Sequence, residues 1–153
     1  MLAIIKPRPF SMNLRMVSMA VLVLGIFAVT SCSRKIAFDT STIVPSAKGM
    51  VKIKKDANGN YRVRVNVRNL AEPERLTPSR RTYVVWIDTD RSGRKNLGQI
   101  TSSTGLFSST MKASLETVTS FRPTRVFITA EDNADITFPG LDIVLQTRYF
   151  STR

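Results

Sequence analysis

Basic and apolar side chains alternate along two neighbouring segments of the chain. Residues 50–54 read MVKIK and residues 61–68 read YRVRVNVR, a period of two that is typical of half-buried β-strands. The Asn58-Gly59 pair between them is a strong β-hairpin signal. We therefore predict a hairpin with one apolar face and one basic face, the basic face formed by Lys52, Lys54, Arg62, Arg64 and Arg68. Such a face would bind phosphates or carboxylates; the alternative is a solvated face whose charges prevent aggregation.

Positive charge is concentrated around this hairpin. The chain has 23 Lys and Arg against 11 Asp and Glu, a formal net charge of +12. Residues 34–95 hold 15 basic and six acidic residues, whereas residues 96–153 hold five of each. The chemistry of the basic face suits anionic lipid, anionic glycan or acidic protein, and charge alone does not choose among these partners.

Residue types that support common catalytic chemistry are scarce. The chain has no histidine and one cysteine, so the usual nucleophile–base pairs are absent. The segment Asp88–Gly93 begins like a calcium-binding loop, but its twelfth position is Gln99 rather than glutamate, and we predict a hairpin turn instead. The acids of residues 131–135 are typical of a solvated turn. We expect no enzymatic activity, no cofactor and no metal site.

An uncharged run at residues 16–31 ends at the single cysteine, Cys32. Basic residues precede the run and no acidic residue occurs before Asp39, which is the layout of a secretory signal. The end of the run, Val29-Thr30-Ser31-Cys32, resembles the lipobox of bacterial lipoproteins. This resemblance implies that residues 1–31 are a signal peptide. It also implies that Cys32 becomes the lipid-modified N-terminus, bearing palmitate or a similar acyl chain, and anchors the protein to a membrane.

Other interpretations of this segment stay open. An uncleaved membrane anchor needs about 20 apolar residues, and the run has 16. A cleaved signal without lipidation would leave a free thiol, and a start at Met12 would give a signal of more usual length. The lipoprotein resemblance implies a location in the bacterial cell envelope. In some lipoprotein families, acidic residues after the cysteine act as signals for inner-membrane retention or surface export. Residues 33–35 carry none, so the resemblance favours the periplasmic face of the outer membrane, where nucleic acid is not an expected partner.

Strand signals dominate the rest of the chain. We predict about seven short strands, near residues 50–54, 61–68, 82–88, 95–100, 106–115, 125–130 and 141–150. Evenly spaced strands with turns between them predict an all-β fold, an antiparallel Ig-like β-sandwich, over residues 48–153. Residues 32–47 are expected to form a tether, with room for one short strand at 35–38. The aromatic residues Trp86, Tyr83, Phe127 and Phe138 are expected to fill the core.

Several motifs of the second half occur in a familiar order. They are the strand Tyr83-Val84-Val85-Trp86, the pair Leu97-Gly98, the strand that ends at Glu131, and Pro139-Gly140 before a last apolar strand. This order resembles the extracytoplasmic domain of anti-sigma factors of the sigma-K regulator type. The resemblance implies a sandwich that senses or supports, and it implies no catalytic residues. Only about fifteen residues precede the apolar run, so a sigma-binding domain is not expected ahead of it.

The sequence therefore predicts a membrane-anchored envelope lipoprotein. Its sandwich would be a non-catalytic binding or scaffold module with a basic hairpin face. The alternative is a structural subunit of an envelope assembly, such as a secretion, transport or fibre complex, which would use an unpaired strand edge or an apolar patch as its contact.

Overall fold

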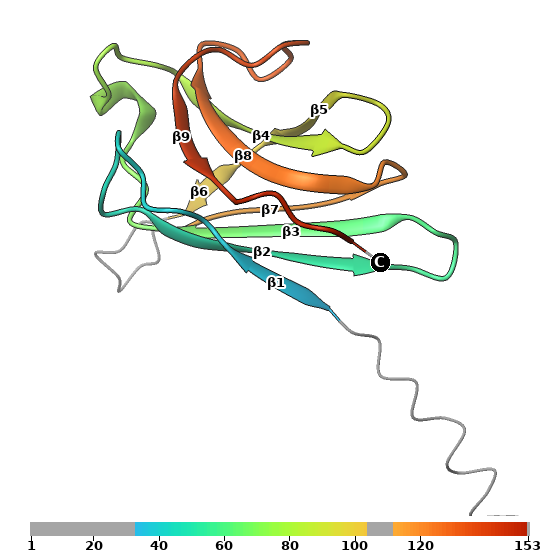
Figure 1. Cartoon of the computed structure of the whole chain (residues 1–153). Helices are drawn as coiled ribbons and strands as arrows, with labels where there is room; N and C mark the ends of the chain where they lie inside the picture. Colours follow the sequence, from blue (N-terminus) through green and yellow to red (C-terminus); the bar gives the residue numbers. More distant parts are fainter. Residues whose placement is uncertain (1–32, 104–111, 153) are drawn as a thin grey trace, which may run out of the picture. The chain divides into compact units, whose positions relative to one another are not determined.

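The computed structural model describes residues 33–103 and 112–152, which form an all-β sandwich (Figure 1). Nine strands and one short 3-10 helix occur in this part of the chain. The elements are β1 (Arg34–Ala37), β2 (Lys48–Lys55), β3 (Tyr61–Arg68), η1 (Pro73–Arg75), β4 (Thr82–Thr89), β5 (Arg94–Gln99), β6 (Thr101–Ser103), β7 (Lys112–Thr119), β8 (Pro123–Glu131) and β9 (Ile143–Gln146). The prediction of an all-β antiparallel sandwich is confirmed.

Two antiparallel sheets make up the sandwich. Sheet A has the strand order β1-β2-β3-β7-β6, and sheet B has the order β5-β4-β8-β9. The predicted β2–β3 hairpin is present, with Gly59 at a positive φ in its turn. The turn requires that conformation, which glycine adopts at little cost. No helix among the described residues is long and apolar enough to span a membrane.

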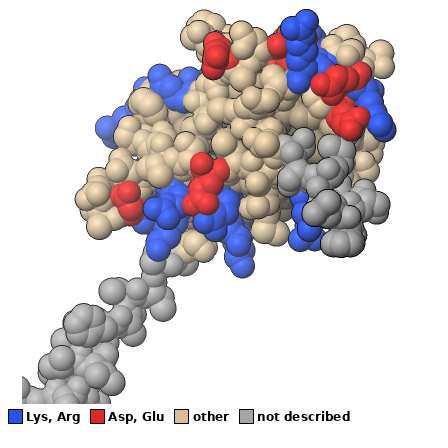
Figure 2. All heavy atoms as spheres, turned by 180° about the vertical axis from the view of Figure 1, so that it is seen from behind, with Lys and Arg blue, Asp and Glu red and all other residues tan. Residues whose placement is uncertain are grey.

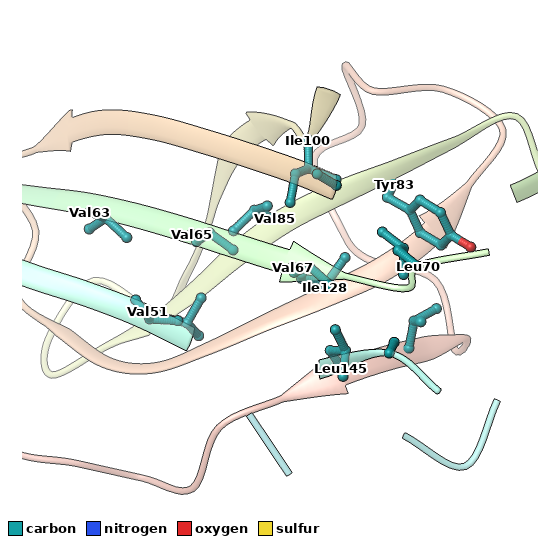
Figure 3. Close-up of a cluster of buried hydrophobic side chains, with 14 of the residues drawn as sticks. Val51, Val63, Val65, Val67, Leu70, Tyr83, Val85, Ile100, Ile128 and Leu145 are labelled. Carbon is teal, nitrogen blue, oxygen red and sulfur yellow. The ribbon is translucent and has the colours of Figure 1, made fainter. Parts of the chain in front are cut away.

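The core lies between the inner faces of the two sheets (Figure 3). Every second residue of β3, from Tyr61 to Val67, is buried there. These side chains pack against residues of sheet B such as Val85, Ile128 and Leu145. Burying one such aliphatic side chain contributes at most about 1.5–3 kcal/mol of hydrophobic free energy, so this layer stabilises the contact between the two sheets.

A second apolar cluster covers the outer face of sheet B. Its fully buried members are Val84, Trp86 and Phe127, and they pack against Ala134, Ile136 and Ile143. Asn96 holds the covering segment in place, since its side-chain amide donates to the carbonyl oxygens of Ala134 at 2.9 Å and Ile136 at 3.0 Å. Strands β4 and β8 are therefore buried on both faces, which explains their nearly continuous apolar sequences.

The aromatic residues do not all lie where we expected them. Tyr83 is buried in the main core, and Trp86 and Phe127 are buried in the second cluster, stacked with ring centroids 6.4 Å apart, so the core prediction is confirmed for these three. The indole N–H of Trp86 donates to Thr129 Oγ1 at 2.9 Å, so its polar group is satisfied. Phe138 is 80% exposed, and the expectation that it fills the core is wrong.

The segment predicted as a tether packs on the sandwich. Residues 34–37 pair with β2 as an edge strand, close to the short strand that we expected at 35–38. Beyond it, Val44 and Ala47 are buried in the core, and Ser41 Oγ accepts the Val44 N–H at 2.8 Å. Residues 34–47 therefore belong to the folded unit, because they bury apolar side chains that a free tether would leave in water.

Two predicted strands have different bounds. The strand expected at 106–115 is β7, which continues to Thr119; residues 106–111 of that prediction lie outside the described residues. The strand expected at 141–150 is shorter, since only Ile143–Gln146 forms β9. After Gln146 the chain follows β8 through separate backbone hydrogen bonds, from Thr147 N to Val126 O and from Phe150 N to Thr124 O.

Candidate functional site

The register of sheet A places the five predicted basic side chains on its outer face. Lys52 lies opposite Arg64 and Lys54 lies opposite Arg62, while Arg68 lies at the other end of the hairpin. The alternate residues of β3 are buried, so the intervening arginines point to solvent. The structure thus brings the predicted set together on one surface, and the hairpin alternation is the cause.

Neighbouring strands extend this surface beyond the prediction. Lys35 on β1 lies opposite Lys52, and Arg68 lies between Lys48 on β2 and Lys112 on β7. We call the resulting set the basic face: Lys35, Lys48, Lys52, Lys54, Arg62, Arg64, Arg68 and Lys112. Lys48 continues the alternation of residues 50–54 by one step and could have been found. Lys112 needed the β3–β7 pairing, for which the sequence has no local signal.

Blue Lys and Arg spheres gather along the lower edge of Figure 2, the edge at which Figure 1 has β1, β2 and β3. Among the described residues of sheet A, Glu116 is the one carboxylate on the outer face. Eight basic groups against one acid leave this surface strongly positive. It can therefore concentrate phosphate or carboxylate groups from solution, most strongly at low ionic strength.

Arg64 and Glu116 form a bidentate ion pair across β3 and β7. Arg64 Nε donates to Oε2 at 2.9 Å, and Nη2 donates to Oε1 at 2.8 Å. The hydrogen bond from Arg64 lowers the pKa of the Glu116 carboxyl below its ordinary value, with further lowering from the charges of Arg64 and Arg62. Arg64 is therefore the member of the basic face whose charge is already matched. Both side chains are nearly half exposed, so the pair contributes little to stability.

The other basic residues of the face lie opposite one another rather than opposite acids. The row Lys48, Arg68 and Lys112 crosses three strands without a carboxylate, and Lys54 lies opposite Arg62. Directly opposed side chains in an antiparallel pair are about 4.5–5.5 Å apart at Cβ, and like charges at that separation repel. A bound anion would relieve this repulsion, which makes the face a candidate anion-binding surface.

The Asp88–Gly93 segment forms the predicted hairpin turn, with the Thr89 N–H bonded to Gly93 O at 3.1 Å. The Asp88 carboxylate accepts from Arg94 Nε at 2.9 Å and lies 3.4 Å from Arg125 Nη1. Tyr149 also donates its hydroxyl to Asp88, at 3.3 Å. The charge of Asp88 is thus matched by two arginines, and its carboxylate has a structural role.

Carboxylates of the 131–142 region hold loops together. Glu131 is buried and accepts the Gly140 N–H at 2.7 Å, so two of the motifs quoted above, the strand-ending glutamate and Pro139-Gly140, are in direct contact. Arg80 donates to Asp142 at 2.7 Å and to Asp132 at 3.0 Å. In the described part of the chain no group of three or more His, Cys, Asp and Glu could hold a metal ion.

A cavity of about 370 Å³ lies at the end of the sandwich where β4 begins. Its lining includes Glu72, Glu74, Arg81, Thr82 and Tyr83. Burial, helped by the charge of Glu74, raises the pKa of Tyr83 to about 12, so this phenol is neutral and donates to Ala71 O at 2.9 Å. No local sequence pattern predicts this cavity, because loop 69–81 forms it by packing against distant strands.

Comparison with known protein families, curated proteins and solved structures found no match for this chain. The sandwich fold hosts many unrelated functions, so the fold alone does not assign one. The basic face, with eight basic side chains on the outer face of sheet A, is therefore the surface from which a function can be inferred.

We predict that Glu116 titrates below its ordinary value of 4.5 and that Arg64→Gln moves its pKa back towards that value. The pair's contribution to the free energy of unfolding is complete above the unfolded-state pKa and is lost as pH falls through the folded pKa. A ¹³C NMR titration of the Glu116 carboxyl measures this shift, with Arg68→Gln as a control that leaves the ion pair intact. Identical titration curves for wild type and Arg64→Gln would contradict the assignment.

Proposed function

We propose that this protein is a lipid-anchored lipoprotein of the bacterial cell envelope whose sandwich is a non-catalytic binding module. The lipobox-like sequence Val29-Thr30-Ser31-Cys32 after an uncharged run supports the anchor. Lipidation of Cys32 with several acyl chains would hold the protein firmly at a bilayer, whereas one chain binds reversibly. We place the anchor in the periplasmic leaflet of the outer membrane, because no acid follows the cysteine in residues 33–35.

The basic face carries the binding part of the proposal. Its charges come from four strands, and only Arg64 among them has an ion-pair partner within the described residues. A solvated face that only prevents aggregation would need fewer basic groups, interspersed with acids. The partner we propose is anionic: an envelope lipid, a glycan or an acidic protein.

We propose no catalytic role, and no cofactor. Asp88, Asp132 and Asp142 are matched by arginines. The likeness to anti-sigma extracytoplasmic domains supports a sensing or scaffold role. Two motifs that carry this likeness, the strand-ending Glu131 and Pro139-Gly140, are joined by a hydrogen bond between Gly140 and Glu131.

A specific observation favours the second candidate function, a structural subunit of an envelope assembly. Phe138 is 80% exposed and Leu141 is 98% exposed, in the same loop. Exposed large apolar side chains in one place suit a protein contact. Chemical cross-linking in membranes separates the two candidates, because a lone species of monomer size with no co-purifying protein would count against a subunit.

We predict that wild-type protein expressed in a bacterial host gains acyl mass and fractionates with the membrane, whereas Cys32→Ala does neither. The thiol of Cys32 is the one acceptor for this modification, because the chain has no second cysteine. Intact-mass spectrometry of both fractions measures the result. Equal mass and equal distribution of the two forms would disprove the lipid anchor.

We further predict that Lys54→Glu, Arg62→Glu and Arg64→Glu together weaken binding to anionic envelope material by roughly one hundredfold at low salt. An exposed ion pair contributes roughly 0.5 kcal/mol, and reversal adds repulsion of similar size at each site, so three reversals cost about 3 kcal/mol. Pull-down from envelope extracts measures binding. The matched control reverses Arg75, Arg81 and Arg148, which are exposed, lie off the basic face and change the net charge equally. Equal binding by the two triple variants would contradict the proposal.

A further inference from the structure

The folded domain begins almost immediately after the proposed anchor. One residue, Ser33, separates Cys32 from Arg34, where β1 starts. An extended chain spans at most about 3.6 Å per residue, so Arg34 must lie within about 7 Å of Cys32. That distance is shorter than the Debye length of about 8 Å at physiological ionic strength. With Cys32 acylated as proposed above, the start of β1 stays where the charge of the lipid surface is only partly screened.

Positive charge is concentrated at this end of sheet A. Arg34 pairs with Ile53 across β1 and β2. Four side chains of the basic face lie close to this pair in the sheet: Lys35, Lys52, Lys54 and Arg62. The carboxylate of the adjoining turn, Asp56, accepts the N–H groups of Asn58 and Asn60, each at 2.9 Å, and so stabilises the turn itself. In Figure 1 the start of β1 and the β2–β3 turn lie on the same side of the sandwich.

Exposed apolar side chains lie beside these basic groups. Val118 on β7 is opposite Arg62 and is 54% exposed. Phe121, which is 37% exposed, follows in the β7–β8 turn and precedes Arg122. This turn is at the same end of the sheet, because Thr119 pairs with Tyr61, the first residue of β3. Apolar side chains flanked by basic ones are the composition that binds the headgroup region of anionic bilayers.

The other end of the sandwich carries less net positive charge. Loop 69–81 follows the far end of β3, and loop 132–142 follows the residue that pairs with Thr82. These two loops contain five carboxylates, Glu72, Glu74, Asp132, Asp135 and Asp142, against three basic side chains, Arg75, Arg80 and Arg81. An anionic surface would attract this end less strongly than the end near Arg34. The charge distribution therefore selects one orientation of the domain.

We infer that the occupant of the basic face is the anionic phospholipid surface of the membrane that holds the anchor. The domain docks through the end that bears Lys52, Lys54 and Arg62, and Val118 and Phe121 reach the headgroup boundary. This inference rests on the proposed lipid anchor. It adds an orientation to that proposal, since the acidic loops with Phe138 then point away from the bilayer and are free for other contacts.

Lysine acetylation footprinting of the full chain in vesicles tests the inference. Lipidated wild type is reconstituted in phosphatidylcholine alone and in phosphatidylcholine mixed with phosphatidylglycerol. Acetylation of Lys52 and Lys54 should slow by about fivefold in the anionic vesicles, the factor expected for one basic side chain held at an anionic leaflet. The difference should vanish near 1 M salt, where the Debye length falls to about 3 Å.

Internal and matched controls make each outcome decisive. Lys48 and Lys112, at the far end of the basic face, should slow less than Lys54. Arg62→Glu should restore the rate at Lys52, and Arg75→Glu should not. Equal rates at Lys54 in both vesicles would overturn the inference, as would equal slowing of all four lysines. If wild type does not float with vesicles of either composition, the lipid anchor itself fails, which is a separate result.

Discussion

The period-two alternation of β3 between the two faces of sheet A is the constraint on which the structure depends. Tyr61, Val63, Val65 and Val67 point into the core, so Arg62, Arg64 and Arg68 must point out. A slip of one residue would bury three guanidinium groups and expose four apolar side chains, which the hydrophobic free energy of the core forbids. The same strand therefore stabilises the fold and presents the charges.

This coupling means that the core sets the register of the charges. Pairing Val51 with Val65, and Val65 with Leu115, leaves Arg68 between Lys48 and Lys112. Only Arg64 has an acid, Glu116, at its cross-strand position. The basic face is thus held together against its own repulsion by the apolar layer beneath it. Functional surfaces commonly oppose stability in this way. A bound anionic partner would make the electrostatic contribution of these side chains to folding stability favourable.

Local patterns predicted the hairpin and the five basic residues, because alternation and the Asn58-Gly59 turn act over fewer than twenty residues. Features that depend on distant pairing were missed. Lys112 joins the face through β7, and the second apolar cluster forms because residues 134–143 cover Trp86 on the outer face of sheet B. The packing of Val44 and Ala47 was also missed, since residues 39–47 show no regular period. In each case the contact partner lies far along the chain.

Salt-dependent unfolding of wild type and Arg68→Gln tests this central claim most directly. Replacing Arg68 removes a charge that lies between Lys48 and Lys112, so the variant should have the higher free energy of unfolding at low salt. The difference should fade as salt screens the repulsion. A variant that is less stable than wild type at low salt, or a difference that salt does not change, would contradict the account.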